Sequence, residues 1–156
     1  MIDLARMAAL VAVLAAAVVY GTDVFCAVVQ RPALARVDDR ALVAVMGNVH
    51  RYGDRRMPVP GALGIIAAAA SGALAALSGR WTATAAAATA VGLLLMWLVL
   101  YVRVSAPINR RLTTAVNAGD VPPNARVLQS DWDRVITARA VLQGLAIAAL
   151  CLALLS

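Results

Sequence analysis

Residues 16–32 read AAVVYGTDVFCAVVQRP, an apolar run that contains one carboxylate, Asp23. The apolar character begins near Met7, so the predicted segment Met7–Val29 reaches the ~20 residues needed to cross ~30 Å of hydrocarbon. A carboxylate is costly inside such a segment. Asp23 therefore indicates either a functional site with a partner for its charge or a structural ion pair. A structural ion pair requires a cation at the same depth.

Three further stretches approach or exceed the same length, and the whole composition agrees with them. Of 156 residues, 63% are hydrophobic and 14% are charged, and the mean hydropathy is +0.83. These values lie outside the range of soluble domains. We therefore predict a single domain, residues 1–156, that is an all-α integral membrane four-helix bundle with cytoplasmic helical extensions. The other spans are Met57–Ser78, Trp81–Val102 and Val135–Leu155.

The arginines gather in the two longer connections. Six lie between the first and second spans and five between the third and fourth, whereas Arg6 and Arg80 alone lie on the other side. The positive-inside rule then predicts a multi-pass cell-membrane protein with both arginine-rich loops in the cytoplasm and both termini outside. Because topology accounts for the net charge of +6, no nucleic-acid partner is predicted. The lipid bilayer is the expected partner.

The arginines just before the second span allow two interpretations. They anchor the chain to anionic lipid, which we favour, or they bind an anionic substrate. These residues are Arg51, Arg55 and Arg56.

The two connections also carry helical patterns. Apolar residues recur at helical spacing after an aspartate cap, which predicts an amphipathic helix lying on the membrane or on the bundle. In the second connection a helix is expected to begin near Asn124 and to run directly into the fourth span. The apolar residues of the first pattern are Leu42, Val45, Met46 and Val49.

Small residues recur at every fourth position of the second span. This pattern allows close approach of helix backbones, either within the bundle or in a homo-oligomer contact. The residues are Gly64, Ala68, Gly72 and Ala76.

Arg139 is the natural partner of Asp23. Counted from the cytoplasmic ends of their spans, the two residues differ in depth by only about 3 Å at ~1.5 Å per residue. Trp132 and Arg139 share one helix face and are expected to point into the bundle together. Three interpretations stay open: a structural ion pair, a pocket in which the pair contacts a ligand, or an unpaired position at the lipid edge.

His50 is the only histidine, so a b-type haem held by two histidines of one chain and a His-rich metal centre are both excluded. A metal site built from His50, Asp54 and Asp23 is not supported by spacing, and no metal or cofactor is predicted. As a general base, His50 would be oriented by Asp54 four residues later. The alternative is an interfacial histidine that contacts headgroups. Tyr101, with Trp97, either lines a cavity or packs in the core.

Three short motifs resemble the anthrone oxygenase-like family of small four-helix membrane proteins. They are GTDVFCAVVQRPAL (21–34), APINRRL (106–112) and DWDRVITAR (131–139). The family pattern P-x-N is matched by Pro107 and Asn109. The pattern W-x-x-x-[His or Asn]-x-x-R is matched by Trp132 and Arg139, but Ile136 occupies its middle position and cannot move a proton.

The resemblance implies a chemistry, because some members of that family oxidise anthrones to anthraquinones with O₂ and no evident cofactor. In this chain Asp23 would be the base and Arg139 would stabilise the developing enolate. Trp132 and Tyr101 would stack on the ligand, with Asn109 and His50 also in the binding site. Two other readings stay open: a non-catalytic membrane protein that binds lipid or a partner, and a small proton-coupled transporter.

Overall fold

The computed structural model of the chain describes residues 1–156 and contains only helices and short connections. This confirms the all-α prediction. Two segments, marked η, are π-helical turns in which the hydrogen bonds run from residue i to residue i−5. In chain order the elements are α1 (Ile2–Phe25), η1 (Cys26–Gln30), α2 (Arg31–Leu34), α3 (Asp39–Arg56), α4 (Pro58–Leu77), α5 (Trp81–Leu100), η2 (Tyr101–Ser105), α6 (Ala106–Ala118) and α7 (Ala125–Leu155).

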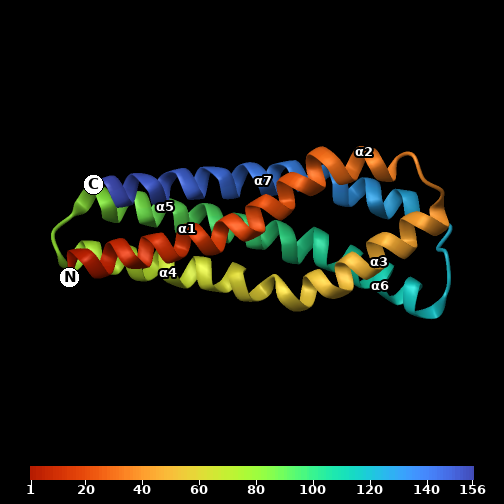
Figure 1. Ribbon diagram of the computed structural model, residues 1–156, viewed down its shortest axis with the longest axis horizontal. Coiled ribbons are helices and arrows are strands. Elements are labelled where there is room, and N and C mark those ends of the chain that lie inside the picture. The colour runs from red at the N-terminus through yellow and green to blue at the C-terminus, as the bar shows by residue number, and fades with distance from the viewer.

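Four continuous helices are long and apolar enough to cross a membrane: Ile2–Leu34, Pro58–Leu77, Trp81–Ala118 and Ala125–Leu155. α1 packs against α4 and α7, and α5 packs against the same two helices, which closes a four-helix bundle (Figure 1). The second predicted span matches its helix to within one residue at each end, and the other three lie inside longer helices. The 31 residues of α7 extend for about 46 Å, so part of this helix projects beyond a ~30 Å hydrocarbon layer.

The parts of the chain that project beyond the hydrocarbon layer form an arginine-rich layer of helices at one end of the bundle. α3 packs against α6, and both lie at the end opposite the two termini (Figure 1). Asp38 caps α3 by accepting a hydrogen bond of 2.7 Å from the backbone N–H of Ala41, as the sequence predicted. Asn124 precedes the first residue of α7, so the prediction of one helix running into the fourth span is also confirmed.

The buried face of α3 differs from the predicted one. Val45 and Val49 are 46% and 42% exposed, whereas Gly47 is buried because α6 crosses at that point. A Cβ atom on Gly47 would lie 2.6 Å from the backbone oxygen of Leu112, so only glycine permits this approach. α3 thus packs on the bundle through a face rotated from the predicted one, formed by Leu42, Val43, Met46, Gly47 and His50.

The core consists of small side chains near the termini and larger ones at the arginine-rich end. Gly64 and Ala68 of the small-residue pattern are buried in the bundle, and a Cβ on Gly64 would lie 3.5 Å from the backbone nitrogen of Ala16. Ser71 donates a hydrogen bond of 2.9 Å to the carbonyl of Ala5. These contacts assign that face of α4 to packing within the bundle.

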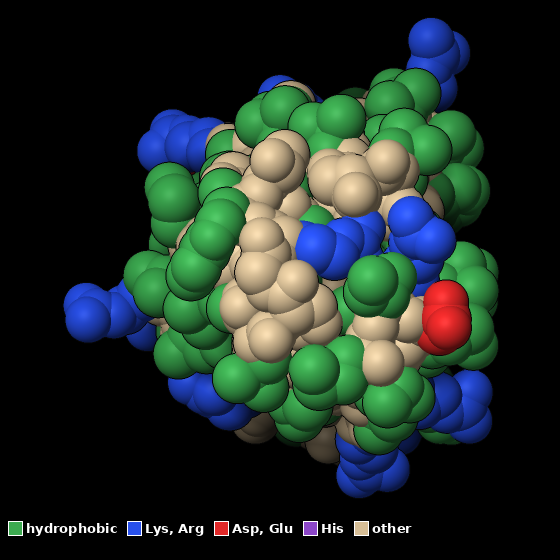
Figure 2. All heavy atoms as spheres, turned by 90° about the vertical axis from the view of Figure 1, so that its left-hand side faces the viewer, with side chains coloured by type: hydrophobic (Ala, Val, Ile, Leu, Met, Phe, Trp, Pro, Cys, Tyr) green, Lys and Arg blue, Asp and Glu red, His purple; other side chains and the backbone are tan.

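The surface changes character along the bundle axis. Viewed from the end that carries both termini, the molecule presents mainly apolar side chains and backbone, with arginine side chains at several places and an acidic group at one side (Figure 2). Large apolar side chains such as Leu14, Leu63 and Val141 are more than 40% exposed on the flanks. An apolar belt of this kind is expected of helices that face lipid.

Candidate functional site

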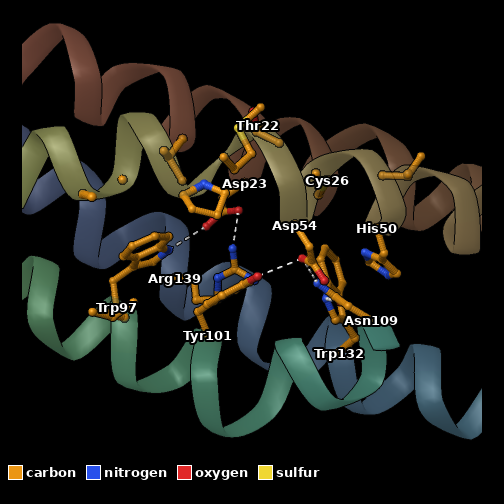
Figure 3. A pocket seen from close by; sticks show the side chains of 18 of the residues that line it. Thr22, Asp23, Cys26, His50, Asp54, Trp97, Tyr101, Asn109, Trp132 and Arg139 are labelled. Carbon is orange, nitrogen blue, oxygen red and sulfur yellow. Dashed lines mark hydrogen bonds and ion pairs between the residues drawn. The ribbon is translucent and has the colours of Figure 1, made fainter. Parts of the chain in front are cut away.

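A cavity of about 410 Å³ lies between the part of the core made of small side chains and the part made of larger side chains. Its walls come from α1, α3, α4, α5 and α7, with Asn109 contributed by α6 (Figure 3). All the side chains predicted for the site lie in this lining: Asp23, His50, Tyr101, Asn109, Trp132 and Arg139. The structure therefore brings the predicted residues together, although their roles in chemistry stay predictions.

Asp23 and Arg139 form a buried ion pair. Nη2 of Arg139 donates to Oδ1 of Asp23 at 2.8 Å, and the two side chains are only 6% and 4% exposed. The predicted match in depth between the first and fourth spans is thereby confirmed. Because the pair lines the cavity, it can hold the bundle together and also face a ligand.

Both oxygens of Asp23 are already occupied by donors. Oδ2 accepts from Nε1 of Trp97 at 3.2 Å and from Nε2 of Gln143 at 2.6 Å. Gln143 was not among the predicted residues, but it follows Arg139 by four positions and therefore lies on the same face of α7. A carboxylate whose two oxygens accept several hydrogen bonds is held in one position.

Arg139 is surrounded by aromatic rings. Its Nη1 donates to Oγ of Ser105 at 2.8 Å, and its Cζ lies 5.4 to 5.8 Å from the ring centroids of Trp97, Tyr101 and Trp132. Nε is buried and has no hydrogen-bond partner. Cation–π contacts of this kind stabilise a buried guanidinium.

A second polar network crosses the cavity nearer its arginine-rich end. Oδ1 of Asp54 accepts from the hydroxyl of Tyr101 at 2.8 Å and from Nδ2 of Asn109 at 2.7 Å. Oδ1 of Asn109 in turn accepts from Nε1 of Trp132 at 3.0 Å. From the sequence, Asp54 is a candidate partner of His50 or a metal ligand beside it. Its contacts with Tyr101 and Asn109 join α3 to the third long helix and cannot be predicted from local spacing.

His50 differs from its predicted arrangement. Asp54 bonds Tyr101 and Asn109, and no hydrogen bond joins it to His50. The imidazole packs against Trp132 with centroids 5.5 Å apart, is 4% exposed, and has no partner for Nε2. Burial, reinforced by the charge of Arg139 and opposed by that of Asp54, lowers the pKa of His50 to about 4. His50 is therefore neutral at pH 7 and does not contact headgroups.

Two π-helical turns shape the cavity. η1 follows Asp23 by three residues and η2 begins at Tyr101, and each turn is followed by a proline, Pro32 or Pro107. Proline has no N–H and its ring collides with the carbonyl four residues earlier, so the preceding turn widens instead of closing normally. The Pro-x-Asn motif thus sets the path of the third long helix just before Asn109.

Ile136 does not reach the cavity. It is completely buried in the larger core cluster and is absent from the lining, so it packs rather than reacts. No three His, Cys or Asp side chains gather closely enough to hold a metal ion.

Comparisons with protein-family models, with curated proteins and with solved structures found no match to this chain. The resemblance to the anthrone oxygenase-like family therefore stays a prediction from short motifs. Only the geometry of the cavity bears on function.

Proposed function

We propose that this protein binds a lipophilic aromatic molecule, taken from the bilayer, in the cavity beside the Asp23–Arg139 pair. The observation that carries the proposal is the lining itself. It combines an apolar volume of about 410 Å³ with the rings of Trp97, Tyr101 and Trp132. Ligand pockets typically join such apolar walls to a few well-placed polar groups.

The position of the cavity supports entry from lipid. Its lining reaches the surface at apolar residues of two neighbouring helices, Ile66 of α4 and Leu95 of α5, which are 66% and 47% exposed. Both residues lie within helices that are apolar enough to span a membrane. A molecule dissolved in the hydrocarbon layer can reach such an opening without crossing water.

Oxidation of the bound molecule by O₂ is the second candidate function, and one observation favours it. The oxygen Oδ2 of Asp54 receives no hydrogen bond from the protein, so a base is available in an apolar cavity. An activated ring C–H would lose its proton to that base, and the resulting carbanion would add O₂ to give a hydroperoxide. Loss of water from the hydroperoxide breaks the O–O bond and leaves a new ring carbonyl. Asp23, whose oxygens are occupied, is better suited to holding Arg139 beside the developing enolate.

A cavity-filling variant tests both candidates. Gly53 lines the cavity, and a Cβ built there meets no atom within 4 Å, so Gly53→Leu adds bulk without a direct clash. We expect this variant to weaken anthraquinone binding at least ~10-fold, measured by quenching of tryptophan fluorescence in detergent. Oxygen uptake with anthrone, measured above autoxidation, should fall in parallel if the protein is an enzyme.

Gly92→Leu is the matched control, because Gly92 also has open space around its Cβ but is not part of the lining. Binding without oxygen uptake would leave the protein as a non-catalytic binder. The absence of saturable quenching in the wild type, or equal behaviour of the two leucine variants, would exclude the binding site proposed here.

We place the arginine-rich end of the bundle in the cytoplasm and both termini outside, in line with the positive-inside rule. Both termini lie at one end of the bundle (Figure 1), so one reporter suffices as a test. We expect alkaline phosphatase fused after Ser156 to be active in intact bacterial cells and green fluorescent protein fused there to be dark. The opposite pattern would invert the orientation.

A further inference from the structure

We infer that Asp54 recognises a hydroxyl group on the bound aromatic molecule, so that the cavity selects phenols over aromatic compounds without an O–H group. This inference rests on the proposed binding function and specifies its ligand class. It comes from the hydrogen bonds around Asp54, which leave one carboxylate oxygen without a partner inside the lining of the cavity.

The bonding of Asp54 is one-sided. Oδ1 accepts from Tyr101 and from Asn109 at 2.8 and 2.7 Å, whereas Oδ2 accepts nothing from the protein. No arginine nitrogen lies within 4 Å of either oxygen, because every ion pair of the chain involves another aspartate. A half-buried carboxylate in this state has acceptor capacity that a ligand donor can fill.

Asp54 is also held rigidly. Tyr101 stacks on Trp97 at a centroid distance of 6.1 Å and an interplanar angle of 16°. Asn109 is oriented from its other side by Trp132. The two donors to Oδ1 are therefore locked by packing and by a second hydrogen bond, which keeps Oδ2 in one position (Figure 3). A preorganised acceptor discriminates between ligands better than a mobile one.

The charge of the cavity narrows the class of donor. An amine cation would also satisfy a carboxylate, but Arg139 lines the same cavity and lies 5.4 Å from the ring of Tyr101. Its charge disfavours a second cation, and a charged amine partitions poorly into hydrocarbon. A phenol carries no positive charge and partitions into hydrocarbon. Its ring would lie against the aromatic walls and its O–H would be directed to Asp54.

The test compares 2-hydroxyanthraquinone with its methyl ether, 2-methoxyanthraquinone, in detergent at a pH below the pKa of the probe's hydroxyl group. Binding is measured by quenching of tryptophan fluorescence. We expect the wild type to prefer the hydroxyl compound by about 10- to 100-fold, since the ether covers the free carboxylate oxygen without supplying a donor.

Asp54→Asn should abolish this preference, because the two donors at Oδ1 hold the amide oxygen there and so place the amide N–H₂, which cannot accept a hydrogen bond, where Oδ2 lies. Asp3→Asn is the matched control, since it removes one carboxylate at the opposite end of the bundle, and it should retain the preference. If Asp54→Asn does not fold, Tyr101→Phe serves as a second variant. It keeps the carboxylate but removes one of the two donors that hold it, so the preference for the hydroxyl compound should shrink without disappearing, and an unchanged preference would contradict the role of Asp54.

The outcomes separate the two proposals. If both probes bind the wild type equally, or if Asp54→Asn keeps the preference, the role of Asp54 is refuted while the aromatic site stands. If neither probe quenches in a saturable way, the binding function itself fails. A loss of affinity for both probes to the same extent in Asp54→Asn would mark Asp54 as structural only and would also overturn the inference.

Discussion

Asp23→Asn is expected to lower the free energy of unfolding by about 3–5 kcal/mol, the usual cost of removing one partner of a buried ion pair. The variant leaves the charge of Arg139 in a site where its side chain is only 6% exposed. It also creates a donor conflict. One oxygen of Asp23 faces Arg139 and the other faces Trp97 and Gln143, so the amide N–H₂ of asparagine must point at a donor on one side or the other.

Cys26 provides the measurement. It is buried one helical turn after Asp23, whereas Cys151 is exposed. In a Cys151→Ala background, a maleimide dye therefore reports unfolding of the cavity region by reaction with Cys26 during heating in detergent. We expect the transition of Asp23→Asn to occur at a clearly lower temperature than that of the parent.

A second substitution distinguishes loss of the Asp23–Arg139 ion pair from non-specific destabilisation of the fold. Arg139→Gln, made in the Asp23→Asn chain, removes the uncompensated charge and should recover part of the lost stability. Additive destabilisation by the two substitutions would mean that the contact at 2.8 Å contributes no coupling. Wild-type stability of Asp23→Asn alone would contradict the account of this pair altogether.

Stability is expected to fall by about 2 kcal/mol as the pH drops from 7 to 5, because of His50. The pKa of His50 is lowered to about 4 in the folded protein, with burial as the largest cause, and is about 6.5 in the unfolded chain. Between these two values the unfolded state binds more protons than the folded state. The contribution is therefore fully present above pH 6.5 and is lost progressively toward pH 4.

His50→Phe is the comparison variant, since it keeps a ring against Trp132 but cannot titrate. Unfolding by sodium dodecyl sulfate, followed by circular dichroism at pH 7 and pH 5, gives the two stabilities. The wild type should lose much more stability than His50→Phe over this interval, because His50 is the only histidine. Parallel pH dependence in both proteins would show that His50 is not the group responsible.

Much of the candidate site followed from residue type and depth. An aspartate and an arginine in different spans are expected to pair, because an unpaired charge is costly among apolar residues. Helical periodicity placed Trp132 on the same face as Arg139, and the structure confirms both inferences. For α3 the sequence indicates an apolar face that includes Val45 and Val49, whereas the close approach at Gly47 turns a neighbouring face toward α6 and leaves these two valines exposed.

The sequence by itself determined the all-α class, the approximate positions of the four spans and the arginine-rich end, and it favoured the pairing of Asp23 with Arg139. Each of these follows from periodicity along one helix or from the cost of charge in an apolar segment, and both are local properties. Only the tertiary structure decided that Asp54 bonds Tyr101 and Asn109 rather than His50. That contact depends on the rotation of α3 against the third long helix and on the widened turn before Pro107, which arise from packing between elements distant in the chain.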